Sequence, residues 1–211
     1  MPMLSSKVLR LSRFHLRTLL LFMLVCCAMF AFVGSQRRTH ARQVMAANRL
    51  QELGFGFQFH DKPFLSLPLQ PILGDDSYSR VRRVFGRAKF QSQIGHSDVF
   101  ILLAELQRVE EVDIRYLRCG PKGMSAISRN RSLKRVDLSY SSVSDADIAI
   151  FGNLPHLRDL RLAGTSISDS SVDVIISRMS SLRGLDISLS NITPSGFERL
   201  RIAMPATVIV Y

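Results

Sequence analysis

The sequence lacks the residues from which disulfide frameworks and metal centres are built. It has three cysteines among 211 residues, and two of them, Cys26 and Cys27, lie in an uncharged apolar run. The third, Cys119, falls where the chain repeats an aliphatic residue, so we interpret all three as small apolar side chains. The five histidines include no pair four residues apart, and no cysteine–histidine spacing is typical of a metal site. We therefore predict no disulfide, no metal and no cofactor.

Catalytic constellations are also missing. His96-Ser97-Asp98 has the residue types of a hydrolase triad, but three consecutive residues cannot converge on one another, and a helix start explains them better. The stretch 120–123, Gly-Pro-Lys-Gly, lacks the spacing of a phosphate-binding loop. The sequence therefore predicts that the protein is not an enzyme.

Acidic residues are absent from the first 50 positions, which hold eight of the 28 lysines and arginines. The remaining residues hold 20 bases against 17 acids, so most of the net charge of +11 belongs to the N-terminal segment. Nucleic-acid-binding domains carry a basic stripe on their folded surface. We expect no such stripe on the rest of the chain, which excludes nucleic acid as a partner.

The longest uncharged run follows this basic start, at residues 18–34. As a helix the run would be about 26 Å long, close to the ~30 Å hydrocarbon core of a bilayer. We predict a basic tail at 1–17, a transmembrane helix at 18–34 and single-pass membrane attachment through that helix. The alternative is a secretory signal peptide cleaved between Ser35 and Gln36.

Basic residues flank the run on both sides, four before it and four after it, so the positive-inside rule discriminates weakly between the two orientations. A short N-terminal tail is most easily left inside while the bulk of the chain is exported. We therefore predict a cytoplasmic N-terminus, with the remainder of the chain outside the cytoplasm.

Two short segments separate the apolar run from the last part of the chain. The first, 35–53, has apolar residues near one face and predicts a juxtamembrane helix. For 54–80 we predict a cap strand and a linker, because Phe55, Phe57 and Phe59 alternate with glycine or polar residues. We expect all three phenylalanines to pack on the domain that follows; contact with lipid headgroups is the alternative.

The remaining residues, 81–211, repeat an apolar pattern every 24 or 25 positions. Hexapeptides of the form L-x-x-L-x-L, with aliphatic substitutions, begin at Val109, Leu133, Leu157 and Leu182. Two further columns keep this phase: Cys119, Val143, Ile167 and Ile192 form one, and Met124, Ile148, Val172 and Phe197 form the other. A period of 20–29 residues with this core is typical of a leucine-rich repeat.

Each unit combines a strand with a helix. The hexapeptides alternate apolar and polar residues, which indicates a strand, and helical spacing follows. Ser144, Ser168 and Thr193 each precede an aspartate or a proline, so we predict them as helix N-caps. We expect a degenerate first strand at 80–85 and a closing strand at 206–211.

On these motifs the chain resembles leucine-rich-repeat proteins of the β–α kind. The stretch 157–169, LRDLRLAGTSISD, matches the pattern L-x-x-L-x-L-x-x-(S/T)-x-(I/V)-(S/T)-D throughout. The layout is also similar to that of short bacterial membrane-anchored repeat proteins, which carry R-F-x-L-R-T-L-L, here at 13–20, and L-G-D-D, here at 73–76. The resemblance implies an α/β fold: a short solenoid, with parallel strands on the concave face and helices on the convex face, behind an N-terminal transmembrane helix.

In this pattern the polar strand residues project from the concave face, and strands about 4.8 Å apart bring equivalent residues together. The candidate partner-binding residues are Arg115, Arg135, Asp137, Asp159, Arg161 and Asp186. We expect Arg135, Asp137 and Arg161 to be exposed. These columns contain no aromatic residue, so no aromatic hot spot is evident. The alternative is that opposite charges of neighbouring repeats only bridge one another.

We therefore predict a non-catalytic protein-binding module, displayed at a membrane surface and holding a protein partner on its concave face. The alternative is a structural or envelope-associated membrane protein with no dedicated ligand. Signal cleavage would instead give a secreted binding module.

Overall fold

The structure is a computed structural model, and the residues that it describes are 6–59, 81–86, 96–106, 108–118 and 120–211. Three features of the sequence lie outside these residues: the predicted linker at 60–80, which contains the L-G-D-D motif, the first residues of the basic tail, and Cys119.

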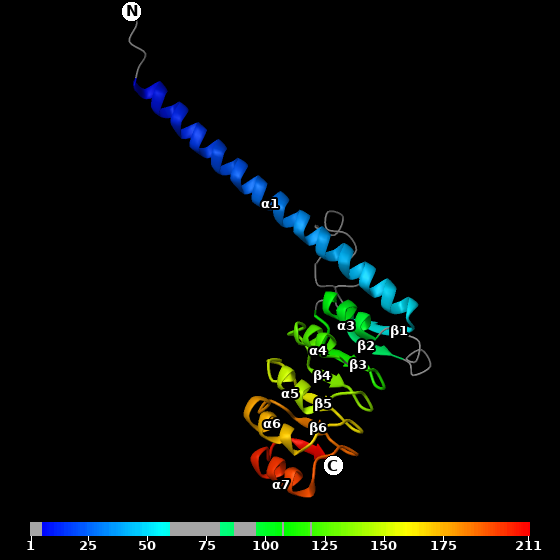
Figure 1. Cartoon of the computed structure of the whole chain (residues 1–211). Helices are drawn as coiled ribbons and strands as arrows, with labels where there is room; N and C mark the ends of the chain where they lie inside the picture. The colour runs from blue at the N-terminus through cyan, green and yellow to red at the C-terminus, as the bar shows by residue number, and fades with distance from the viewer. Residues whose placement is uncertain (1–5, 60–80, 87–95, 107, 119) are drawn as a thin grey trace, which may run out of the picture.

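A seven-stranded sheet runs through the repeats, and its strands lie in chain order from β1 to β7 (Figure 1). Strands β2 to β7 are parallel, whereas β1 is antiparallel to β2. The expected strands at 80–85 and 206–211 correspond to β2 and β7. The strands are β1 Phe55–Phe59, β2 Val81–Gly86, β3 Glu111–Asp113, β4 Arg135–Asp137, β5 Asp159–Arg161, β6 Gly184–Asp186 and β7 Val208–Val210.

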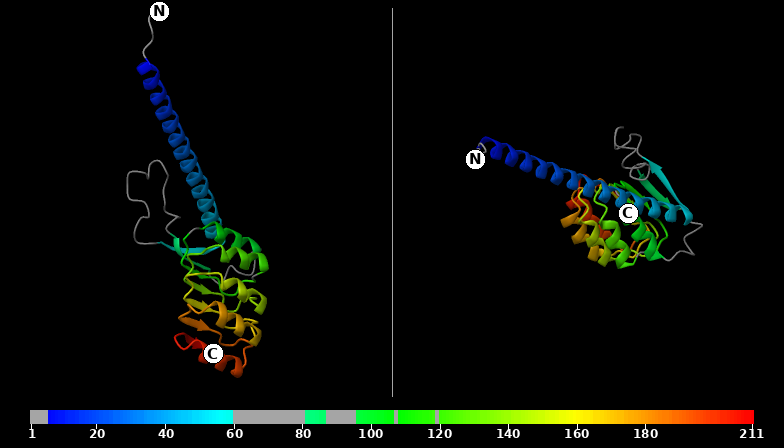
Figure 2. Two further views of the ribbon diagram at one scale, coloured as in Figure 1. Left: turned by 90° about the vertical axis from the view of Figure 1, so that its left-hand side faces the viewer. Right: turned by 90° about the horizontal axis from the view of Figure 1, so that it is seen from above.

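A helical segment connects each parallel strand to the next, as parallel pairing requires. These segments lie side by side on one side of the sheet, so the fold is α/β with two layers (Figures 1 and 2). The helices are α1 Ser6–Glu52, α3 His96–Glu105, α4 Pro121–Ser128, α5 Asp145–Phe151, the 3-10 helix η3 Asp169–Ser171, α6 Val172–Arg178 and α7 Pro194–Ala203.

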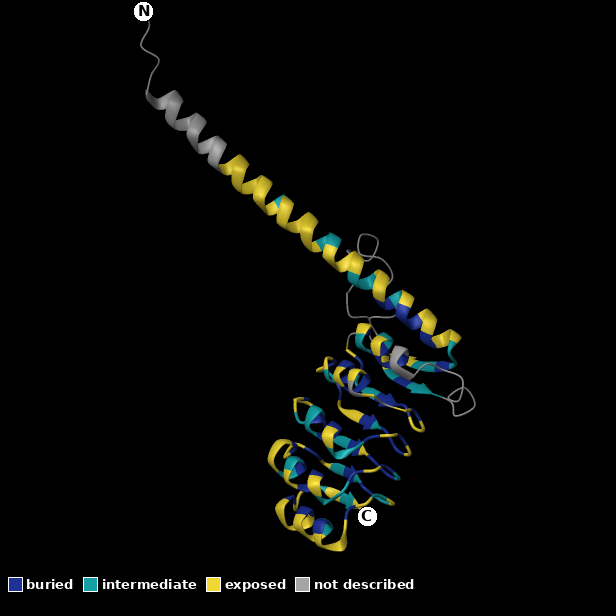
Figure 3. Ribbon diagram, in the orientation of Figure 1, coloured by how far each residue is buried: buried dark blue, intermediate teal, exposed yellow. Residues whose placement is uncertain are grey.

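The core lies between the strand layer and the helix layer (Figure 3). Val136, Leu160 and Leu185 pair in register at the centres of three adjacent strands, and each is at most 1% exposed. The repeat phase predicted for this core is therefore confirmed. In the second predicted column Met124, Ile148 and Val172 are buried, whereas Phe197 is only partly buried in the last helix.

Aspartates at two helix starts bind the next repeat along the chain. The Asp145 carboxylate accepts the backbone N–H of Ser168 at 2.7 Å, the hydroxyl of Ser168 at 2.6 Å and the hydroxyl of Ser171. Asp169 likewise accepts the N–H of Thr193 at 2.8 Å and its hydroxyl at 2.6 Å. The three predicted N-caps are confirmed. The sequence did not show that the aspartate after one N-cap binds the N-cap of the following repeat.

This link predicts an acid-sensitive contribution to stability. Burial would raise the pKa of Asp145, but the hydrogen bonds from Ser168 and Ser171 outweigh it and hold that pKa below its ordinary value of 3.8. A carboxylate with a lowered folded-state pKa stabilises the fold above its unfolded-state pKa, and this stabilisation is lost as pH falls through the folded-state value.

We expect Asp145→Asn to lower the free energy of unfolding at neutral pH by on the order of 1–3 kcal/mol. The difference from the parent should shrink in acid, and urea unfolding at neutral and acid pH measures both values. Asp173→Asn is the matched control, because the Asp173 side chain is 75% exposed and pairs only with Arg199 among the described residues. A difference between Asp145→Asn and the parent that is the same at both pH values would contradict the link.

Helix α1 continues without a break from the apolar run to the first repeat (Figure 1). It is the one described helix that is long and apolar enough to cross a membrane, and none of its most apolar window is buried in the protein. A signal sequence near an N-terminus has the same character. Near the other end of α1, Ala46, Ala47 and Leu50 are buried, and this part of α1 packs against α3. The last turns of α1 therefore cover the end of the repeats.

Strand β1 completes this cover only in part. Phe55 is 4% exposed and Phe57 is half-buried, but Phe59 is 46% exposed. The expectation that all three phenylalanines are packed is therefore wrong for Phe59. The pairing of β1 with β2 shifts register between Gln58 and Phe59, which takes the last phenylalanine out of the alternation that buries the first.

Candidate functional site

The face of the sheet away from the helices, here called the strand face, carries the charged columns in register. Side chains alternate along a strand, so residues on either side of a buried central valine or leucine point to this face. The pairs Glu111 with Arg135 and Arg135 with Asp159 are confirmed, as is the pair Asp137 with Arg161. Arg83 of β2 extends the first column by pairing with Glu111.

Opposite charges on the strand face form one connected network of ion pairs. Arg135 lies between Glu111 and Asp159, with nitrogen–oxygen distances of 3.7 and 3.4 Å. Arg161 lies 3.6 Å from Asp137. The ion pairs between neighbouring repeats, the alternative that the sequence offers, are thus present. Each such pair stabilises the fold by only about 0–1 kcal/mol, because the arginine side chains are 56% and 61% exposed.

Arg115 connects the two adjacent aspartates of the second column. Its Nε donates to Asp113 Oδ1 at 2.9 Å and lies 3.9 Å from Asp137 Oδ2. The hydrogen bond to Asp113, together with its negative charge, raises the pKa of Arg115 above the ordinary value, so the guanidinium stays charged. A fixed cation between like charges offsets their repulsion.

The network has two layers. The side chains of Glu111 and Asp113 are 12% exposed and that of Asp137 is 14% exposed, whereas the arginines above them are about half exposed. Asp137 also accepts the backbone N–H of Ser139 at 3.0 Å. The expectation that Asp137 is exposed is therefore wrong. Its short side chain stays close to the strand and holds the turn that follows, while the longer arginines reach over it.

Asp186 is the candidate residue that stands apart. It pairs in register with Arg161, but among the described residues it forms no ion pair. It accepts the backbone N–H of Ser188 at 3.1 Å and the Ser188 hydroxyl at 2.7 Å, so it too supports a turn. The other five candidates, Arg115, Arg135, Asp137, Asp159 and Arg161, lie close together. Three of them, Arg135, Asp137 and Arg161, surround an open hollow over Val112 and Val136 together with Arg83, Glu111 and Asp113.

An aromatic pair that the columns did not reveal borders the network. The rings of Tyr116 and Tyr140 stack with centroids 5.1 Å apart, and the residues are 52% and 46% exposed. Both follow directly after the third polar position of their strands and have positive φ, as do Gly164 and Leu189 in the same column. A bulky residue in this conformation is unusual and is typical of functional turns. These four positions recur in the sequence at intervals of 24, 24 and 25 residues, and this recurrence is the signal from which the turn column could have been predicted.

Glycine at position 164 allows this aromatic pair. A Cβ at Gly164 would lie 2.5 Å from Cδ1 of Tyr140, so any larger residue would displace the ring. No group of three His, Cys, Asp or Glu in the described part of the chain could hold a metal ion. The polar groups of the strand face are therefore arginine donors above the covered carboxylates of Glu111, Asp113 and Asp137, with the more exposed Asp159 and two stacked phenols beside them.

The chain is similar to known leucine-rich-repeat proteins. Residues 97–210 match the family model described as the LRR repeats of FBD-associated F-box protein At5g56370. An LRR protein from Leptospira interrogans has a solved structure that is 14% identical, with a TM-score of 0.47, and the match covers 73% of this chain. For an internalin (inlF) from Listeria monocytogenes the values are 13%, 0.38 and 55%. The chain spans 42% of the length of each of these two structures. No curated protein matches the chain.

Proposed function

The chain belongs to the leucine-rich-repeat family, and we propose that it is a non-catalytic module that binds a protein on its strand face and is held at a membrane by α1. The family match confirms the broader resemblance seen in the sequence. The narrower resemblance to short bacterial membrane-anchored proteins stays a prediction. In this proposal the repeats form a short solenoid, with the strands on its concave side.

The layered arginines are the observation that carries the proposal. Arg135 and Arg161 are 56% and 61% exposed, and each of their guanidinium groups has five N–H donors. Beside them lie the stacked Tyr116 and Tyr140. Arginine and tyrosine are the residue types that concentrate binding energy at protein interfaces. The carboxylates beneath hold the arginines in place, so less side-chain entropy is lost on binding.

The membrane part of the proposal rests on α1. Its apolar residues, such as Leu24 at 69% and Phe30 at 79% exposed, have no protein cover among the described residues, and the helix continues without a break into the cap of the repeats. We infer a cytoplasmic N-terminus with the repeats on the other side of the membrane. A structural role without a dedicated ligand is the second candidate, because the ion pairs of the strand face can satisfy one another without a partner.

Replacing Arg135 and Arg161 together by alanine tests the proposal. We expect capture of the partner, measured by crosslinking in native membranes followed by mass spectrometry, to fall roughly tenfold or more. Capture by the parent should also fall with added salt. Asp137 is left in place because its removal would disturb a turn.

The matched control replaces Arg199 and Arg201, which are exposed on α7 and also ion-paired. It should capture the same proteins as the parent. Capture that is equal for the parent and both variants would exclude the strand face as the binding surface and favour the structural role.

A further inference from the structure

The two edges of the repeats around β4, β5 and β6 carry opposite charge. The segments 128–134, 152–158 and 177–183 each lead from a helix to the next strand, and they contain no acidic residue. Their bases are Arg129, Arg131, Lys134, Arg158, Arg178 and Arg183, all exposed. The segments 140–147 and 164–173, at the opposite edge, contain four aspartates and no base. The expectation that the repeats lack a basic stripe is therefore wrong, because the small net charge hides this separation.

These six residues, here called the basic edge, are mostly unpaired. Lys134 binds Glu110 at 2.5 Å, but within the described part of the chain the five arginines form no ion pair. Arg158 and Arg183 follow one another in adjacent repeats, since the N–H of Arg183 donates to the carbonyl of Arg158. Neighbouring like charges destabilise a sheet unless an anion offsets them. Helix C-termini offset part of this charge near Arg129 and Arg178, but the other arginines lie beyond the helices.

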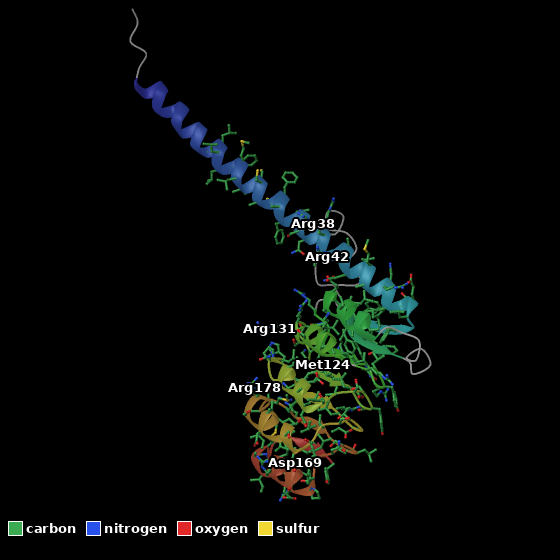
Figure 4. The ribbon with its side chains drawn as sticks, viewed as in Figure 1. Arg38, Arg42, Met124, Arg131, Asp169 and Arg178 are labelled. Atoms are coloured by element: carbon green, nitrogen blue, oxygen red, sulfur yellow. The ribbon has the colours of Figure 1, made fainter. Side chains whose placement is uncertain are left out.

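The basic edge faces the side on which α1 extends. The stack of repeats does not continue the axis of α1 but turns away beneath it (Figures 1 and 2). Figure 4 shows Arg131 and Arg178 on the side toward which α1 leans, with Arg38 and Arg42 further along α1. The helix from Gly34 to Glu52 is only about 27 Å long, so a bilayer that surrounds the apolar run, as proposed above, would lie close to this side of the repeats.

We propose that the basic edge rests on anionic lipid headgroups of the membrane that α1 crosses, an inference that depends on the membrane anchor in the proposed function. Guanidinium groups bind phosphate oxygens in a bidentate manner. Each base close to an anionic surface strengthens association roughly fivefold. Contact at the basic edge leaves the strand face, with its arginines and tyrosines, free for a protein.

A single tryptophan can report this contact, because the chain has none. His156→Trp places the reporter on the basic edge at an exposed position. The full-length protein is inserted into vesicles of phosphatidylcholine, with or without phosphatidylglycerol, in which some phosphatidylcholine carries a nitroxide on its headgroup. The edge variant adds R131Q, R158Q and R183Q to the reporter, and the control variant adds R118Q, K122Q and R199Q.

We expect tryptophan quenching in anionic vesicles to be roughly twofold stronger than in neutral vesicles or more. High salt should remove the gain, since the screening length falls from about 8 Å to about 3 Å at 1 M salt. The edge variant should lose the gain, because three bases together contribute roughly 100-fold to association. The control variant, with the same loss of charge, should keep it. Both variants change exposed residues, and equal melting temperatures would show that both are folded.

Equal quenching in both kinds of vesicle, for a protein that floats with both, would overturn the lipid contact and leave the anchor intact. Failure of the anchor has a different result, because the protein would then not float with neutral vesicles. Flotation with anionic vesicles alone, lost in the edge variant, would support the lipid contact without the anchor. If the edge variant instead loses affinity for a DNA duplex while quenching is the same in both vesicles, the basic edge is a nucleic-acid surface and the inference fails.

Discussion

Replacing Leu160 by alanine should lower the free energy of unfolding by ~2–5 kcal/mol, a large part of the stability of a small domain. Leu160 is fully buried in the interior strand β5, with Val136 on one side and Leu185 on the other. Neither neighbour can move into the space, because each is held by its own repeat. The cavity therefore remains and adds to the lost burial of the side chain.

Arg158→Ala provides the control within the same repeat. Arg158 is exposed and forms no ion pair among the described residues, so its loss should change stability by no more than ~0.5 kcal/mol. Urea unfolding of a fragment of residues 36–211 measures both variants without the apolar run. The fragment must begin before Ala46 and Leu50, because these residues cover α3. Similar losses from the two variants would show that the repeat phase is misassigned.

The repeat period explains why so much of the strand face could be written from the sequence. A spacing of 24 or 25 residues places equivalent positions on adjacent strands, so the pairing of Arg135 with Glu111 and Asp159 follows from counting. The same counting locates the buried columns and the N-caps. The pairing of Arg83 with Glu111 was not predicted, because the spacing between β2 and β3 differs from the repeat period of 24 or 25 residues. The residue opposite Arg83 could therefore not be found by counting along the sequence.

Other features of the strand face and of the edges depend on side-chain length, turn conformation and charge distribution, which the repeat period does not determine. Which partner of an ion pair lies beneath depends on side-chain length, so Asp137 is covered while Arg161 stays exposed. The stack of Tyr116 on Tyr140 depends on left-handed backbone in the turns, which the apolar pattern does not report. The basic edge was not predicted, because the net charge of the repeats is a sum over two edges that the fold places on opposite sides.

Replacing Leu24 by arginine should release the protein from the membrane. Leu24 lies near the middle of the apolar run and is 69% exposed on α1, so it faces lipid in a membrane-spanning helix. An arginine at the centre of such a helix costs about 2.5–3.5 kcal/mol of insertion free energy, which corresponds to roughly 100-fold in the insertion equilibrium. The arginine cannot easily reach the interface from this depth, whereas Arg37 beyond the end of the run can.

The measurement is the fraction of full-length protein that stays in the membrane pellet after an alkaline carbonate wash. The parent should remain in the pellet and Leu24→Arg should move largely to the supernatant. Met45→Arg is the matched control: Met45 is 73% exposed on the same helix but lies beyond the apolar run, so a charge there should leave the protein in the pellet. Release of the full-length parent would contradict the anchor. A mature chain that begins at Gln36 would identify the run as a cleaved signal, because only an uncleaved helix can hold the repeats at the membrane.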